Sequence, residues 1–150
     1  MMKIGDICTR DVVIVGRGVS VREAAMLMRE HHVGDLVVVD TVGGRNVPVG
    51  VITDRDVTIE VVAMGVDPDM VKVGEVMGPE LVAVGEGETV YDTIQRMRQR
   101  GVRRTPVLDA QGGLLGIVSL ADLLEFVAEE MTQLARVFYR EQTRETENLL

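Results

Sequence analysis

The sequence predicts an α+β fold, built as a tandem pair of β-α-β-β-α repeats that pack on each other with pseudo-two-fold symmetry. Three observations support this prediction. The chain can be aligned with itself, each copy alternates short apolar segments with an amphipathic helical pattern, and the composition is 46% hydrophobic but only 3% aromatic. A chain of 150 residues can bury a proper core, which here must consist mainly of Val, Ile, Leu and Met.

The internal repeat is the most informative of these features. When residues 7–44 are placed over residues 76–113, twelve of the 38 pairs are identical, including Gly16/Gly85, Val21/Val90, Met28/Met97 and Asp40/Asp109. After an insertion of three residues in the first copy the register resumes, and it pairs Gly50 with Gly116 and Asp56 with Asp122.

Each copy opens with a short strand, at residues 12–15 and 81–84. A glycine-containing turn follows, and then a helix that begins at a capping box. Ser20 stands three residues before Glu23, and Thr89 three before Asp92. Apolar residues then recur on one helical face, as Val21, Ala24, Ala25 and Met28 do in the first copy.

The second half of each copy predicts a hairpin and a helix. Strands are expected at 36–39 and 105–108, with return strands at 49–52 and 115–118 and paired glycines in the turns between them. Helices are expected from about 54 to 64 and from 120 onward. Pro48 and Pro106 favour edge or end positions, because proline cannot donate a ladder hydrogen bond.

This pattern divides the chain into a first repeat at residues 1–65, a linker at 66–75, a second repeat at 76–128 and a C-terminal helical tail at 129–150. In the tail Leu123, Val127, Met131, Leu134 and Phe138 recur at steps of three and four. The first half of this helix is expected to pack on its own repeat and the second half to contact another subunit. After Arg140 the sequence is polar and is expected to fray.

Composition excludes several functions. The net charge of −8 argues against nucleic-acid binding, which depends on Lys and Arg. One cysteine, Cys8, rules out an internal disulfide or a thiolate metal cluster. There is no apolar segment of membrane-spanning length and no signal-peptide pattern, so we expect a cytoplasmic protein without a membrane partner.

One polar pattern is repeated where a strand ends and a helix begins, as Gly50-Val51-Ile52-Thr53-Asp54-Arg55-Asp56 and Gly116-Ile117-Val118-Ser119-Leu120-Ala121-Asp122. Thr53 and Ser119 are placed as helix N-caps. Asp56 and Asp122 lie one turn in, where a carboxylate can accept two hydrogen bonds from the vicinal diol of ribose. The same residues also form an ordinary capping box, which is a purely structural feature.

With these motifs, and with Gly-Asp-Leu-Val-Val-Val-Asp (34–40) and Arg-Arg-Thr-Pro-Val-Leu-Asp (103–109), the two copies resemble CBS motifs, which occur in tandem pairs called Bateman modules. The resemblance spans about residues 2–128. It implies a regulatory ligand, AMP, ADP, ATP or S-adenosylmethionine, bound between the repeats without a required cofactor or metal. The ligand-binding residues that it implies are Thr9, Val13, Gly34, Asp35, Thr53, Arg55, Asp56, Pro79, Val82, Arg103, Arg104, Ser119 and Asp122.

The two implied pockets differ in charge. Arg103 and Arg104 would stand beside Ser119 and Asp122, where their forked guanidinium groups can hold phosphate. The other pocket has Asp35 in the equivalent place, with Arg55 able to compensate in part. We therefore predict that the Ser119/Asp122 pocket is the better nucleotide site, although Arg103 and Arg104 would serve equally as a solvated surface pair or a dimer contact.

The preferred function is a ligand sensor that binds an adenine-containing small molecule, forms a homodimer and acts on an unidentified effector protein. The alternative is a structural dimerisation or scaffold module with degenerate pockets. An enzyme is disfavoured, because His31 and His32 are adjacent on one helix and no nucleophile–base set stands out. A magnesium ion shared by Asp54 and Asp56, brought in with a nucleotide, is a lesser alternative.

Overall fold

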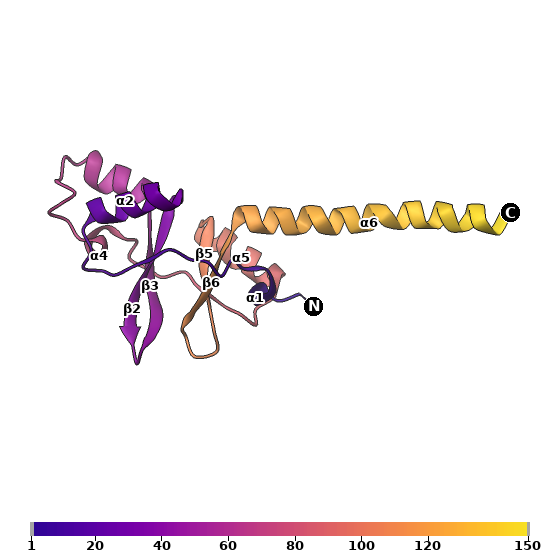
Figure 1. Ribbon diagram of the computed structural model, residues 1–150, viewed down its shortest axis with the longest axis horizontal. Coiled ribbons are helices and arrows are strands. Elements are labelled where there is room, and N and C mark those ends of the chain that lie inside the picture. The colour runs from indigo at the N-terminus through magenta and orange to yellow at the C-terminus, as the bar shows by residue number, and fades with distance from the viewer. Residues whose placement is uncertain (1, 150) are drawn as a thin grey trace.

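The computed structural model describes residues 2–149 and shows two similar lobes with a long helix projecting from one of them (Figure 1). In the first lobe, strands β1 (Ile14–Val15), β2 (Asp35–Val42) and β3 (Arg45–Thr53) form a sheet in the order β1-β2-β3. β1 is parallel to β2, and β2 and β3 are an antiparallel hairpin. Helix α2 (Val21–His31) follows β1, while α3 (Asp54–Val57) and the π-helical turn η1 (Thr58–Val62) follow β3.

The second lobe repeats this order. Its sheet consists of β4 (Val84–Gly85), β5 (Arg104–Leu108) and β6 (Leu114–Ser119), with α5 (Val90–Arg100) after β4 and α6 (Leu120–Leu149) after β6. Each lobe has its own apolar cluster, centred on Leu36, Val38 and Ile52 in the first and on Val84, Val107 and Val118 in the second. The α+β fold with tandem repeats is therefore confirmed.

Two short helices, α1 (Ile4–Ile7) and α4 (Val73–Val76), are exchanged between the lobes. Ile4 of α1 is fully buried in the core of the second lobe, and its amide donates to Glu88 O at 2.8 Å. Val73 of α4 is fully buried in the core of the first lobe, and its amide donates to Val19 O at 2.8 Å. Each repeat therefore supplies a helix that completes its neighbour, and Figure 1 shows α1 beside α5 and α4 beside α2.

This exchange differs from the division expected from the sequence. Residues 3–9, assigned to the first repeat, lie on the second lobe, where Thr9 exchanges two backbone hydrogen bonds with Ile117. The segment 66–75, interpreted as a linker, contains the first three residues of α4. The helix α4 could not be predicted from the sequence, because it is a single turn with one buried residue and is too short for a periodic pattern.

The expectation for Pro106 was wrong. Pro106 lies in β5, the central strand of its sheet, and pairs with Ile117. In the first lobe the amide of Val37 donates to Val13 O, and proline at the equivalent position lacks that donor. The Thr105 hydroxyl replaces it by donating to Val82 O at 2.7 Å. The Thr105 side chain thus supplies the hydrogen bond that the Val82 carbonyl needs, and proline can occupy a central strand.

Two helices also differ from expectation. The helix expected at 54–64 is split into one α-helical turn and the π-helical turn η1. The tail does not fray after Arg140, since α6 remains helical to Leu149. None of the helices within residues 2–149 combines the length and the hydropathy needed to cross a membrane.

Two repeated glycines mark where the exchanged segments cross the hairpins. A Cβ on Gly116 would lie 2.6 Å from the backbone oxygen of Thr9, whereas a Cβ on Gly50 would lie 2.8 Å from Sδ of Met77, a flexible side chain. Gly116→Ala should therefore lower the free energy of unfolding by about 1–3 kcal/mol, measured by urea denaturation. Gly50→Ala is the matched control and should cost clearly less, because Met77 can change rotamer. Equal losses would contradict this account of the crossing.

Candidate functional site

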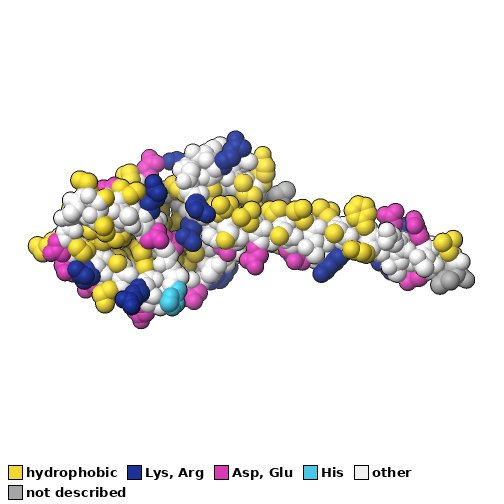
Figure 2. Space-filling model, turned by 90° about the horizontal axis from the view of Figure 1, so that it is seen from above, with side chains coloured by type: hydrophobic (Ala, Val, Ile, Leu, Met, Phe, Trp, Pro, Cys, Tyr) yellow, Lys and Arg dark blue, Asp and Glu magenta, His cyan; other side chains and the backbone are white. Residues whose placement is uncertain are grey.

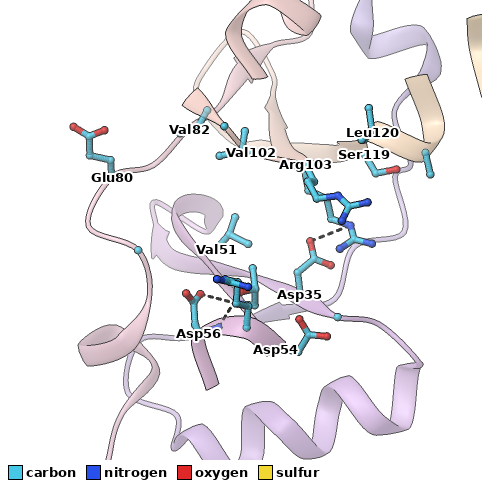
Figure 3. Close-up of a pocket in the computed structure, with 17 residues that line it drawn as sticks. Asp35, Val51, Asp54, Asp56, Glu80, Val82, Val102, Arg103, Ser119 and Leu120 are labelled. Atoms are coloured by element: carbon cyan, nitrogen blue, oxygen red, sulfur yellow. Dashed lines mark hydrogen bonds and ion pairs between the residues drawn. The ribbon is translucent and has the colours of Figure 1, made fainter. Parts of the chain in front are cut away.

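A cavity of about 640 Å³, within the range of small-molecule sites, opens between the two lobes. Both repeats line it (Figure 3). The first repeat contributes the ends of its hairpin and α3, and the second contributes the ends of β5 and β6 together with the segment that leads from α4 to β4. The lining residues are Gly34, Asp35, Val51, Thr53, Asp54, Arg55, Asp56, Gly78, Glu80, Val82, Gly101, Val102, Arg103, Arg104, Ser119, Leu120 and Ala121.

The hairpin registers bring these residues to the cavity. Asp35 pairs with Thr53 at the open end of the β2–β3 hairpin, and Arg104 pairs with Ser119 at the equivalent end of β5–β6. The following residue then closes each end, because Asp54 N donates to Gly34 O at 2.9 Å and Leu120 N donates to Arg103 O at 2.7 Å. The two ends meet across the pseudo-two-fold axis.

Thr53 and Asp56 form a complete capping box. Thr53 N donates to Asp56 Oδ2 at 2.9 Å, and Asp56 N donates to Thr53 Oγ1 at 3.1 Å. Ser119 and Asp122 form the same pair of bonds at 2.9 and 3.1 Å. The structural interpretation of both motifs is therefore correct. The box occupies one carboxylate oxygen of each aspartate, and a carboxylate has two oxygens with about four acceptor positions in all.

Asp35 has a buried carboxylate oxygen that lacks a hydrogen-bond donor within the described part of the chain. Its side chain is 9% exposed, and none of residues 2–149 donates a hydrogen bond to Oδ2. Arg104 Nε lies 3.6 Å from this oxygen, an ion pair too long for a hydrogen bond. Burial raises the pKa of Asp35, Arg104 opposes this rise, and Asp54 adds to it. In Figure 3 the Asp35 carboxylate points toward the arginine side of the cavity.

The cavity therefore has walls of opposite charge. Repeat equivalence makes the contrast clear, since Gly34, Asp35 and Asp54 in the first repeat correspond to Arg103, Arg104 and Leu120 in the second. Three carboxylates, Asp35, Asp54 and Asp56, come from the first repeat, together with Arg55. Arg103 and Arg104 face them from the second repeat, and the other acidic lining residue, Glu80, forms an ion pair with Arg100.

The cavity brings together nine of the thirteen residues predicted from the sequence: Gly34, Asp35, Thr53, Arg55, Asp56, Val82, Arg103, Arg104 and Ser119. The other four lie outside its lining. Thr9 pairs with β6, Val13 packs partly buried against the first core, Pro79 is exposed between two lining residues, and Asp122 caps α6. The lining also contains residues that the sequence did not single out for this role, namely Val51, Asp54, Gly78, Glu80, Gly101, Val102, Leu120 and Ala121.

The arrangement of the arginines differs from expectation. The sequence placed Arg103 and Arg104 with Ser119 and Asp122, apart from the pocket of Thr53 and Asp56. In the structure both arginines line the cavity that contains Asp56, while Asp122 does not. Residues of one repeat face the other across the axis, and this pairing was not visible from spacing along the chain. Asp54 and Leu120 were not predicted as cavity residues for the same reason, because they line the cavity only where the two repeats face each other.

Comparison with protein families gives a match to the CBS domain over residues 4–63 and 73–129. Among curated relatives, the CBS domain-containing protein YhcV of Bacillus subtilis is 38% identical over 82% of this chain and 84% of its own length. An uncharacterized protein of Methanopyrus kandleri, MK0525, is 35% identical over 83% of this chain, which spans 62% of that protein.

Solved structures give the same fold. Hypoxic Response Protein I, crystallised with two coordinated zinc ions, has a TM-score of 0.73 and 32% identity and covers 84% of this chain and 99% of its own. The CBS domain pair of protein MJ0100, in complex with 5′-methylthioadenosine and S-adenosyl-L-methionine, has a TM-score of 0.74 at 23% identity and covers 87% of this chain and 98% of its own.

The raised pKa of Asp35 predicts how stability depends on pH. An aspartate with a raised folded-state pKa stays protonated to a higher pH in the folded protein than in the unfolded chain, where its pKa is about 3.8. Its effect on stability is therefore most favourable below pH 3.8 and becomes unfavourable as the pH rises through the folded-state pKa. Asp35→Asn should accordingly raise Tm at pH 7 and lose this part of the pH dependence, measured by thermal unfolding between pH 4 and pH 8.

Asp40 is a control of opposite sign on the same strand. Its hydrogen bonds with Arg17 hold the pKa of Asp40 below its usual range, so Asp40→Asn should lower Tm at pH 7. A lower Tm for Asp35→Asn at pH 7 would mean that the attraction of Arg104 outweighs the cost of burial.

Proposed function

The chain belongs to the CBS-domain family, and from this premise we propose that it is a regulatory module that binds an adenosine-containing ligand between its two repeats and acts on a partner protein. One observation carries the proposal: the cavity combines a carboxylate suited to a ribose diol, Asp56, with two arginines suited to an anionic group, Arg103 and Arg104. Val51, Val82 and Val102 add apolar surface on which a base can pack.

The mode of action is binding rather than catalysis. The relatives compared above carry no enzymatic name, and the one called a CBS domain-containing protein is named for its domain alone. A signal to an effector requires two states that the ligand binds with different affinity, and the energy of the signal is limited to that difference. The exchanged helices α1 and α4 connect the two lobes, so a change in the angle between the lobes would have to move these helices.

The charges of the cavity favour particular ligands within this class. A triphosphate would carry several negative charges toward Asp35 and Asp54. S-adenosylmethionine carries two positive groups, a sulfonium and an ammonium, and one carboxylate. Its charges match the two walls, with the positive groups toward the aspartates and the carboxylate toward Arg103 and Arg104. AMP, with a single phosphate, is the next best match, followed by ADP and ATP.

A scaffold module with degenerate pockets is the second candidate. The complete capping boxes favour it, because Asp56 and Asp122 each have a structural role without any ligand. Binding measurements separate the two functions.

Titration calorimetry with AMP, ATP and S-adenosylmethionine tests the site. Asp56→Asn keeps an oxygen for the cap but removes the charge that holds the diol, and should weaken binding at least about tenfold, which corresponds to roughly 1.4 kcal/mol. Asp122→Asn makes the same change in the symmetry-related box, whose aspartate lies outside the cavity lining, and should alter affinity by less than about threefold. Loss of binding in Asp122→Asn alone would favour the Ser119/Asp122 site, and no binding of any of the three ligands would favour the scaffold.

Asp35→Asn gives a second test, in which two ligands respond in opposite directions. Removing the buried carboxylate should strengthen ATP binding by about tenfold, since a repulsion of roughly 1.4 kcal/mol is lost. It should weaken binding of S-adenosylmethionine, which loses an attraction. Parallel calorimetric titrations of both ligands measure the two changes. Changes in the same direction would argue against Asp35 as the residue that discriminates between them.

A further inference from the structure

Helix α6 extends far beyond the lobe from which it starts. It runs for 30 residues, from Leu120 to Leu149, and among these Leu123 alone is buried. Phe126 is partly buried against the same core. From there on the helix has no lobe beneath it and projects away from the molecule (Figure 1). A helix gains most of its stability in a protein from packing of an apolar face, and this one leaves most of its apolar residues uncovered.

These uncovered residues follow a heptad pattern. Six of them are separated by steps of four, three, four, three and four, the spacing of the a and d positions of a coiled coil. They are Leu120, Leu124, Val127, Met131, Leu134 and Phe138, with exposed fractions of 40, 62, 43, 65, 68 and 69%. We call this set the α6 seam. Apolar side chains form a band along the projecting helix in Figure 2.

The seam has definite limits. The next positions in the same pattern are Glu141 and Glu145, so the apolar stripe stops at Phe138. It spans 18 residue steps, about 27 Å at about 1.5 Å per residue. Glu125, Glu129 and Arg136 occupy other faces of the helix. A contiguous exposed stripe of this kind marks an interaction surface.

We propose that the α6 seam binds the α6 seam of a second copy of this chain, with the two helices antiparallel and related by a two-fold axis near residue 129. The spacing of the seam is symmetric about that point. An antiparallel pair places Leu120 opposite Phe138 of the second copy, Leu124 opposite Leu134 and Val127 opposite Met131. Every seam residue therefore meets another seam residue, which is the self-complementarity that a two-fold interface requires.

Residues beside the seam fit the same arrangement. Ala121, Ala128 and Ala135 recur every seven residues at the e position, and in an antiparallel pair e positions face each other, so small side chains line one whole edge. On the other edge Val137, which is 60% exposed, lies opposite the position of Leu123 of the second copy, whose side chain is buried in its own lobe. One residue opposes the pairing, since Glu130 lies near the axis and faces Glu130 of the second copy.

The position of the lobes favours the antiparallel orientation. The seam begins at Leu120, directly at the end of β6. Paired helices lie only about 8–10 Å apart, so a parallel pair would place both lobes at the same end of the seam, where they would have to pack beside each other. An antiparallel pair places the lobes at opposite ends of the seam. A lipid surface suits this helix poorly, because amphipathic membrane helices are rich in Lys and Arg whereas this chain carries a net charge of −8.

Sedimentation of the full chain at micromolar concentration tests the pairing, which does not depend on any ligand. The wild-type chain should be dimeric. Met131→Glu buries a charge in the seam and should weaken dimerisation at least about 100-fold. Thr132→Glu adds the same charge one residue away on an exposed face and should leave the dimer intact. Circular dichroism monitors whether the lobes of each variant remain folded. A monomeric wild-type chain, or a Met131→Glu chain that dimerises normally, would overturn the proposal.

Two further variants test the orientation. In a Cys8→Ser background, a mixture of Leu124→Cys and Leu134→Cys chains should form a disulfide between the two different chains. A parallel pair would instead link two Leu134→Cys chains and would contradict the antiparallel arrangement. Glu130→Gln should tighten the antiparallel dimer by removing the repulsion at the axis. In a parallel pair Glu130 faces Ala135, so an unchanged affinity would also count against the proposal.

Discussion

The exchange of α1 and α4 between the lobes is the constraint on which the rest of the structure depends. Each lobe has only a three-stranded sheet with one main helix, and such a unit buries too little apolar surface to be stable by itself. Ile4 and Val73, both fully buried, complete the neighbouring core. The exchange also fixes the lobes face to face, and it carries the segment of Gly78, Glu80 and Val82 from α4 on the first lobe back to β4 of the second. The cavity is lined along this return path.

The same exchange explains why duplicated motifs acquire different surroundings. The Thr53/Asp56 box and the Ser119/Asp122 box contain the same two hydrogen bonds, of 2.9 and 3.1 Å in both boxes. Their neighbours nevertheless differ, because the first repeat places Asp35 and Asp54 at the axis where the second places Arg104 and Leu120. The repeat therefore preserves the fold while the axial residues diverge in charge. One wall attracts cations and the other anions, which a cavity between two identical repeats could not achieve.

Much of this could be predicted from the sequence. The self-alignment, the capping residues Ser20 and Thr89 and the glycine pair of the first hairpin identified the repeats and most of their elements, since these signals are local. Features that depend on contacts distant in sequence escaped prediction. Val73 has the sequence context of a linker, although it is buried in the core of the first lobe. Pro106 is unsuited to a central strand by its sequence alone, but Thr105 supplies the missing hydrogen-bond donor. Arg103 and Arg104 come close to Asp56 only because the two repeats face each other across the axis.

Leu120 connects the cavity with the α6 seam. It lines the cavity, it begins α6, and it is the first residue of the seam. A ligand that covers Leu120 changes the surroundings of a side chain that, in the proposed dimer, lies opposite Phe138 of the second copy. Thermodynamic linkage then makes the two events reciprocal: if the dimer orders Leu120 in the position that suits the ligand, the ligand must favour the dimer to the same degree. Leu120 is therefore the residue through which the proposed dimer and the proposed ligand would affect each other, because it belongs to both surfaces.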